Sequence, residues 1–193
     1  MFMFDIETLG IESTTVILSA AITHFDFGDR DMPSGKERYY DFFNRSLFVK
    51  FNAKEQLEKY NRTVTKSTLE WWSKQSENAR RLALEPSTND VSADVGIESL
   101  RDYIKKFNVN NQIIWARGTL DQTAIDSLCR NVGVEPLVNY NQWRDVRTAV
   151  DLLASDAKNG YCSIENFNPD IWVTKHDPRS DCALDIMMLL YHK

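Results

Sequence analysis

Residues 1–8 read MFMFDIET, and we expect the rest of the chain to be organised around them. Four apolar residues followed by Asp5 and Glu7 predict a strand that is buried on both faces and acidic at its carboxyl end. Because successive side chains of a strand point to opposite faces, the two carboxylates project from the same face. Burying them unpaired would cost on the order of several kcal/mol, so a bound cation is the obvious partner. A solvent-facing acidic pair is the alternative, and the pattern alone favours neither.

The composition indicates a single domain, which we expect to span residues 1–193. Of the 193 residues, 42% are hydrophobic and 26% are charged, enough for one sizeable core. No apolar run approaches the roughly 20 residues that cross a bilayer, so we expect no membrane partner. The three cysteines are odd in number and lack Cys-x-x-Cys spacing, which argues against disulfides and zinc. With no export signal before the first strand, we expect a cytoplasmic protein.

The net charge of −5 argues against a protein that holds long stretches of nucleic acid, because such proteins are normally basic. An acidic total is compatible with an enzyme that grips a few nucleotides, provided that metal ions screen its carboxylates and basic side chains meet the phosphates locally. The candidate basic residues, each of which could equally be a solvated surface charge, are Arg117, Arg144, Arg147, Lys175 and Arg179.

The remaining chain predicts an α/β fold. Enrichment in β-branched and aromatic residues predicts further strands over residues 14–25, 38–48, 112–116 and 138–143. Helical spacing predicts helices over 53–60, 66–76, 78–85, 91–107, 119–131, 145–155 and 178–191, with loops over 25–37 and 156–175. Short connections favour an antiparallel meander of the first three strands. The later alternation of strands and helices implies a mixed sheet with helices on both faces.

A second acidic position, Asp121, follows the fourth predicted strand. Thr119 and Gln122 form a Thr-x-x-Gln capping box, which places Asp121 in the first turn of a helix. Acids favour helix N-termini for dipole reasons alone, at roughly 0.3 to 1 kcal/mol, so position is the stronger argument. Sites in open α/β sheets gather outside the carboxyl ends of adjacent strands. Asp121 would therefore face Asp5 and Glu7 if the first and fourth strands are neighbours.

The third position lies in residues 176–181, HDPRSD. Asp177 followed by proline predicts the cap and first residue of the last helix. This places Asp181 one turn inside the helix and His176 on the loop before it. The arrangement can aim an imidazole and a carboxylate into one cleft.

These residues together are the set that metal-dependent phosphodiester chemistry needs. Two Mg²⁺ or Mn²⁺ ions about 3.5 to 4 Å apart require shared carboxylate oxygens, and they can orient a water and stabilise a leaving 3′-oxygen. A histidine, with a reference pKa of about 6.5, is suited to take the proton from that water.

At this point the chain resembles the DEDDh branch of the DnaQ-like 3′–5′ exonucleases, which have an RNase H-like fold. Asp5 and Glu7 match the first motif of that branch, Asp121 the second, and His176 with Asp181 the third. The matches run in the family's order and span nearly the whole chain.

Two further stretches narrow the resemblance. Residues 68–75, TLEWWSKQ, and 144–148, RDVRT, look like the exonuclease A group of T-even-type phages and its bacterial exoribonuclease relatives. The resemblance implies a five-stranded sheet, formed by a three-strand antiparallel meander plus two parallel strands. It also implies an exonuclease that releases nucleoside 5′-monophosphates from a single-stranded 3′ end, with DNA favoured and RNA as the alternative. A phage protein would act in the host cytoplasm.

By the same resemblance, Asp5, Glu7 and Asp181 would hold one Mg²⁺ or Mn²⁺ ion and Asp5 and Asp121 a second. His176 would be the general base. Arg117 is our candidate for contact with a substrate phosphate.

The resemblance also places the backbone around Thr8 and Leu9 against the terminal nucleotide. Leu120 stands where many relatives carry an aromatic residue before the second-motif acid. Neighbouring Trp71 and Trp72 point about 100° apart on a helix, so both cannot enter the core equally. Core packing of both is the more common arrangement, and we assign Trp72 to the substrate if one ring faces a base.

Two other functions fit parts of the pattern. An aspartyl-phosphate phosphatase also opens with an apolar strand ending in acids, but it needs Asp-x-Asp, and position 7 is Glu. A nonenzymatic RNase H-like binding module would normally have lost carboxylates, whereas this chain keeps all four and the histidine. The sequence leaves the oligomeric state open.

Overall fold

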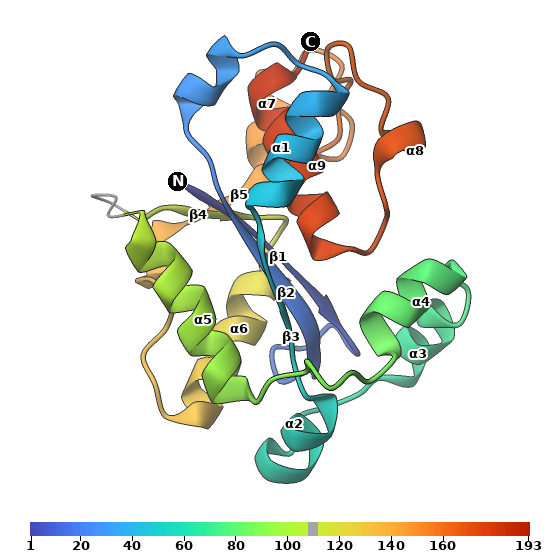
Figure 1. Cartoon of the computed structure of the whole chain (residues 1–193), viewed down its shortest axis with the longest axis vertical. Coiled ribbons are helices and arrows are strands. Elements are labelled where there is room, and N and C mark those ends of the chain that lie inside the picture. Colours follow the sequence, from blue (N-terminus) through green and yellow to red (C-terminus); the bar gives the residue numbers. More distant parts are fainter. Residues whose placement is uncertain (108–111) are drawn as a thin grey trace.

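The computed structural model describes residues 1–107 and 112–193 and is built on one five-stranded sheet (Figure 1). The strands, in the spatial order β3-β2-β1-β4-β5, are β1 (Phe2–Thr8), β2 (Ile17–His24), β3 (Leu47–Lys50), β4 (Ile114–Ala116) and β5 (Trp143–Asp145). β2 pairs antiparallel with both β1 and β3, while β4 pairs parallel with β1 and β5. The predicted α/β class and mixed sheet are confirmed.

Helices cover both faces of the sheet (Figure 1). They are α1 (Lys36–Arg45), α2 (Ala53–Tyr60), α3 (Lys66–Trp72), α4 (Glu77–Leu84), α5 (Ala93–Lys106), α6 (Leu120–Val132), α7 (Val146–Leu153), α8 (Pro169–Trp172) and α9 (Pro178–Tyr191), with short 3₁₀ turns η1 (Phe27–Asp31) and η2 (Tyr140–Gln142). Buried side chains of α5 and α6 form the core on one face, and those of α1, α7 and α9 form the core on the other.

The central strand β1 belongs to both cores, as its apolar run predicts. Phe2, Phe4 and Ile6 pack with α5 and α6, and Met3 packs on the opposite face with α9. A third cluster, in which Leu9 meets Trp72 and α4, holds α3 and α4 beside the carboxyl end of β1. The strand is therefore fixed on both faces, and its acidic end lies beside Trp72 of α3 and beside His176, which precedes α9.

The strand predicted over residues 38–48 is wrong over most of its length. Residues 36–45 form α1, and the strand that follows is only β3. Tyr39 and Phe42 are both buried against the α9 side of the sheet, which a helix achieves because residues three apart share a face. The aromatic residues that suggested a strand are thus the apolar face of a helix. β2 and β3 still pair antiparallel, but through a helical crossover in place of the short meander turn.

The other differences are smaller. β5 begins at Trp143, the last residue of the predicted strand 138–143, because residues 140–142 form the 3₁₀ turn η2. The stretch 156–175, expected to be irregular, contains the short helix α8. The remaining predicted helices are confirmed within a few residues. The cysteines are free, and no helix in residues 1–107 or 112–193 is long and apolar enough to span a bilayer.

One close approach gives a stability test of this packing. Gly96 of α5 lies so near the ring of Phe51 that an added Cβ would be 2.2 Å from a ring carbon. Alanine is the better helix former by about 1 kcal/mol, yet we expect Gly96→Ala to lower the free energy of unfolding by about 1 to 3 kcal/mol through overpacking. Urea unfolding measures this, with Glu98→Ala on the exposed face of α5 as the control. A Gly96→Ala protein at least as stable as the wild type would contradict the packing.

Candidate active site

The site begins with Asp5 and Glu7, which project from the α9 side of β1. The sheet register pairs them with Ala21 and Ser19 of β2, two small residues. Glu7 is buried, and Asp5 is largely enclosed. Two acidic side chains are therefore held together, away from bulk water, at the end of the central strand.

Asp121 joins them from the start of α6. Its side chain is 6% exposed, and its Oδ1 accepts a 3.0 Å hydrogen bond from the main-chain N–H of Ile6, the residue between the two acids of β1. The expectation that the first and fourth strands are neighbours is confirmed. The predicted capping box is wrong, because Thr119 has a helical backbone conformation and its side chain makes no capping bond. The hydrogen bond to β1, which sequence cannot reveal, holds Asp121 in place.

Asp181 and His176 come from the start of α9. As predicted, Asp177 caps the helix by accepting a hydrogen bond from Arg179 N, and Pro178 is its first residue. His176 has φ +64°, a left-handed conformation that is uncommon outside glycine and recurs where side chains serve a function. Nδ1 of His176 lies 3.7 Å from Oε1 of Glu7.

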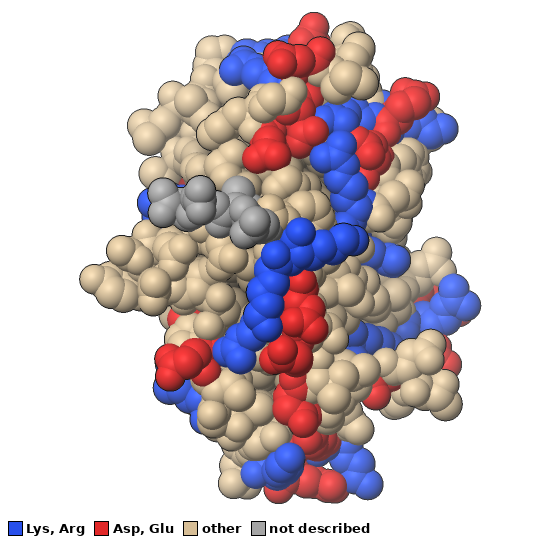
Figure 2. Space-filling view, turned by 60° about the vertical axis from the view of Figure 1, so that its left-hand side comes forward, with Lys and Arg blue, Asp and Glu red and all other residues tan. Residues whose placement is uncertain are grey.

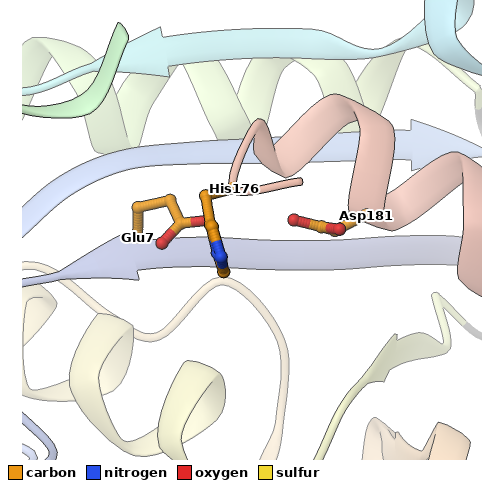
Figure 3. A group of neighbouring side chains, drawn as sticks. All are labelled: Glu7, His176 and Asp181. Atoms are coloured by element: carbon orange, nitrogen blue, oxygen red, sulfur yellow. The ribbon is translucent and has the colours of Figure 1, made fainter. Parts of the chain in front are cut away.

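Ligand-capable atoms of Glu7, His176 and Asp181 all lie within 4.8 Å of one another (Figure 3). Figure 3 shows the imidazole between the two carboxylates, which come from opposite ends of the sequence. The structure thus brings the predicted site residues from β1, α6 and α9 to one place.

Several carboxylates lie close together at the end of β1. Burial raises the pKa of Asp5 well above its ordinary value, and the charges of Asp121, Asp181 and Glu7 raise it further. Burial also raises the pKa of Glu7, although the neighbouring His176 lowers it in part. Burial raises the pKa of Asp181 as well. Burial raises the pKa of Asp121 to about 7. Carboxylate oxygens that repel one another in a buried site suit Mg²⁺ or Mn²⁺, which prefer hard oxygen ligands and would relieve the repulsion.

Two comparisons with known proteins bear on this site. The sequence profile of the 3′-5′ exoribonuclease Rv2179c-like domain matches residues 1–184. The chain belongs to this exonuclease family. The exonuclease is also 33% identical over 207 residues to the exodeoxyribonuclease of Enterobacteria phage T4, across 98% of this chain and 87% of that protein. Both findings confirm a DnaQ-like 3′–5′ exonuclease and favour neither the phosphatase nor the nonenzymatic binding module.

The exposure of the two tryptophans of the exonuclease does not fit our assignment of Trp72 to the substrate. Trp72 is 1% exposed, and its Nε1 donates a 2.9 Å hydrogen bond to the carbonyl of Thr8. A base cannot stack on this buried ring. Trp71 is 42% exposed and meets the ring of His176 edge to face, with 4.7 Å between centroids. The expectation that both indoles pack in the core is wrong, and the exposed ring is Trp71.

The backbone at Thr8 and Leu9 is held by bonds within the chain. Oγ1 of Thr8 donates to the carbonyl of Gly10 at 2.7 Å, and the N–H of Leu9 donates to the carbonyl of Val16 at 3.0 Å. With the Thr8 carbonyl engaged by Trp72, these groups form a rigid wall beside Glu7. Their predicted contact with the terminal nucleotide stays a prediction.

Arg117 does not have the free guanidinium that our phosphate assignment requires. Its Nε and Nη2 bind the carboxylate of Asp185, with 2.5 Å between Nη2 and Oδ1. Sequence reasoning missed Asp185, although its position four residues after Asp181 places both acids on one face of α9. Arg179, a second candidate for phosphate contact, likewise forms an ion pair within the chain, with Asp177.

Other charged side chains are engaged within the chain. Asp145 caps α7 by accepting from Thr148 N at 3.0 Å. On the face seen in Figure 2, Lys and Arg are interleaved with Asp and Glu. On α5, for instance, Lys105 pairs with both Glu98 and Asp102.

The raised pKa values predict an unusual pH dependence for the metal-free exonuclease. With a pKa of about 7 when folded against 3.8 as the ordinary value, Asp121 binds a proton in the native state that the unfolded chain releases. The protonated Asp121 therefore contributes to the free energy of unfolding at low pH. This contribution, on the order of a few kcal/mol, is lost as the pH rises through 7. We expect chelator-treated protein to unfold at higher urea concentration at pH 5 than at pH 8.

Asp121→Asn isolates this effect, because an amide oxygen can still accept from Ile6 N–H. The variant should be more stable than the wild type at pH 8 and should lose part of the pH dependence. His24, whose pKa is lowered by burial, acts in the opposite direction, and comparison with the wild type removes its contribution. Asp102→Asn, with a side chain 65% exposed, is the control. Greater stability of the metal-free wild type at pH 8 would contradict the electrostatic description.

Proposed function

We propose that the exonuclease removes nucleoside 5′-monophosphates one at a time from a single-stranded 3′ end, with DNA as the favoured substrate and residues 1–193 acting as a single exonuclease domain. The observation that carries the proposal is the convergence of Asp5, Glu7, Asp121 and Asp181 beside His176 at the end of β1. These side chains come from segments that lie far apart in the sequence, so only the folded chain brings them together.

The carboxylates are suited to two divalent cations. Asp5, Glu7 and Asp181 would hold one Mg²⁺ or Mn²⁺ ion, and Asp5 with Asp121 would hold the second. When bound, such ions supply Lewis acidity that stabilises negative charge on the leaving 3′-oxygen. The buried, mutually repelling acids support this role, because the chain places few compensating charges beside them in the described structure.

His176 would act as the general base. Its imidazole would take a proton from the attacking water as the new oxygen–phosphorus bond forms and the bond from phosphorus to the 3′-oxygen breaks. The leaving oxygen then takes a proton from solvent. Glu7, 3.7 Å from Nδ1, can pair with the imidazolium that results. The ring is 27% exposed, so water reaches it.

Trp71 is our candidate for contact with a base. Its exposed ring stands next to His176, which borders the acid cluster formed by Asp5, Glu7, Asp121 and Asp181. Base stacking on an aromatic side chain contributes about 1 to 3 kcal/mol and tolerates any base. Contact of this kind would hold the terminal nucleotides without the extended basic surface that this acidic chain lacks on the face in Figure 2.

The choice of DNA rests on one relative. The phage T4 protein is named an exodeoxyribonuclease and aligns with nearly the whole chain. The family description names an exoribonuclease, so RNA is the alternative substrate. Discrimination depends on contacts to the 2′-hydroxyl, which a direct comparison of the two substrates measures.

Digestion of labelled oligonucleotides tests the proposal. We expect single-stranded DNA with a 5′ label to shorten one nucleotide at a time in Mg²⁺ or Mn²⁺, and a 3′ label to be released first as a mononucleotide. Matched RNA should be cut more slowly, and chelator should stop both reactions. Asp5→Asn should lower kcat on the order of a thousandfold or more with an unchanged circular dichroism spectrum, while Asp102→Asn should not. Internal cuts, or full activity of Asp5→Asn, would refute the proposal.

A second experiment addresses Trp71. Trp71→Ala should raise KM for single-stranded substrate about tenfold or more, because the stacking energy is lost, and should change kcat less. Leu69→Ala removes another exposed apolar side chain from α3 and is the matched control. Unchanged KM in Trp71→Ala would exclude the stacking role while leaving the assignment of the acids intact.

A further inference from the structure

Arg117 and Asp185 form a buried ion pair beside the acid cluster. Arg117 directly follows β4, and Asp185 lies on α9, one helical turn beyond Asp181. Nε of Arg117 lies 3.1 Å from Oδ1 and 3.2 Å from Oδ2 of Asp185, and Nη2 lies 2.5 Å from Oδ1. The two side chains are 12% and 8% exposed. The pair therefore joins the strand that precedes Asp121 to the helix that carries Asp181.

The sheet register places this pair next to the site. β1 and β4 pair Phe2 with Ile114 and Met3 with Trp115, and Arg117 follows the last residue of β4 on the side toward the acidic end of β1. Neighbouring strands lie about 4.8 Å apart. The charge of Asp185 acts on Asp5, and that of Asp5 acts on Arg117. One fixed cation and one further acid thus stand within reach of the predicted metal ligands.

The guanidinium is held on several sides. Nη1 of Arg117 donates to the carbonyl of Gly160 at 2.9 Å, and the ring of Tyr161 lies 4.2 Å from its central carbon. Gly160 has φ +76°, and a Cβ there would lie 2.7 Å from the backbone of Arg147, so the turn that supplies this carbonyl requires glycine. The charge of Arg117 is therefore fixed in position, and it cannot reach a phosphate without breaking these contacts.

A contribution to folding stability does not explain why the fold buries an ion pair at this place. Replacing a buried ion pair by apolar side chains is often neutral or stabilising, because the desolvation of two charges offsets their attraction. In a poorly solvated site, by contrast, fixed charges act strongly on a neighbouring ion. A carboxylate attracts a divalent cation, and a guanidinium at the same place repels it.

We propose that Arg117 and Asp185 act as a matched pair of fixed charges that sets the affinity of the acid cluster for divalent cations, in which Asp185 strengthens and Arg117 limits cation binding. Neither side chain is a ligand in this account. Both are positioning residues, acting through the field that they impose on Asp5, Asp121 and Asp181. The inference rests on the proposed function, because it requires the cluster to bind divalent cations.

Calorimetric titration of Mn²⁺ into four proteins tests the inference without a measurement of activity. Asp185→Asn leaves Arg117 uncompensated, so its Mn²⁺ affinity should fall about tenfold or more. Arg117→Gln leaves Asp185 uncompensated, so its affinity should rise about threefold or more, and an unchanged affinity would overturn the role given to Arg117. The double variant Arg117→Gln/Asp185→Asn should return to within about threefold of the wild type. Arg45→Gln, which breaks ion pairs near the amino end of β1, is the control and should not change the affinity.

The outcomes separate the possible failures. Loss of affinity in both single variants, without recovery in the double variant, means that the pair is merely structural and overturns the inference. A wild-type protein that binds no Mn²⁺ overturns the proposed metal dependence as well. If a single variant fails to fold, Arg117→Lys and the double variant decide, because both keep the net charge of the site. Wild-type affinity in these two folded proteins supports the inference, and a tenfold loss in either overturns it.

Discussion

Several carboxylates are buried together at the end of one strand, and the rest of the fold has to hold them there against their mutual repulsion. Each acid of the cluster raises the cost of ionising the others, and the surrounding protein removes the water that would screen them. Such an arrangement persists only if the scaffold holds the side chains in place by other interactions. The fold does so by fixing β1 between two apolar cores, so that the cost of crowding the charges is offset by packing elsewhere.

Each acid is then positioned by a different kind of local structure. Asp5 and Glu7 take their direction from the alternation of β1, and Asp121 from a hydrogen bond to the backbone of that strand. Asp181 and His176 take theirs from the capped start of α9, with His176 in a left-handed backbone conformation. The central position of β1 is what lets these elements converge, since an edge strand would have one neighbour in the sheet instead of two.

Sequence reasoning succeeded where chemistry and periodicity agree. The apolar run before Asp5, the proline after Asp177 and the helical spacing of most later segments were sufficient to predict the mixed sheet and most of the helices. The same patterns selected acidic residues that the fold brings together, and their roles stay predictions. Sequence reasoning failed at residues 38–48, where aromatic residues fit a strand and a helix equally well and tertiary packing decided. Sequence reasoning also failed to identify the partner of side chains that can bind more than one kind of group. Arg117 could bind a phosphate or a carboxylate, and only the fold shows that Asp185 lies beside it. Nothing in a pair of neighbouring tryptophans tells which one faces water.

The number of divalent ions bound per chain is the decisive measurement for the acidic site. Electron paramagnetic resonance can count Mn²⁺ bound to the wild-type exonuclease in the presence of a single-stranded oligonucleotide whose terminal linkage resists hydrolysis. We expect about two ions per chain for the wild type and about one for Asp121→Asn, which lacks a carboxylate that only the second ion would use. The absence of bound Mn²⁺ in the wild type, or an unchanged count in Asp121→Asn, would contradict it.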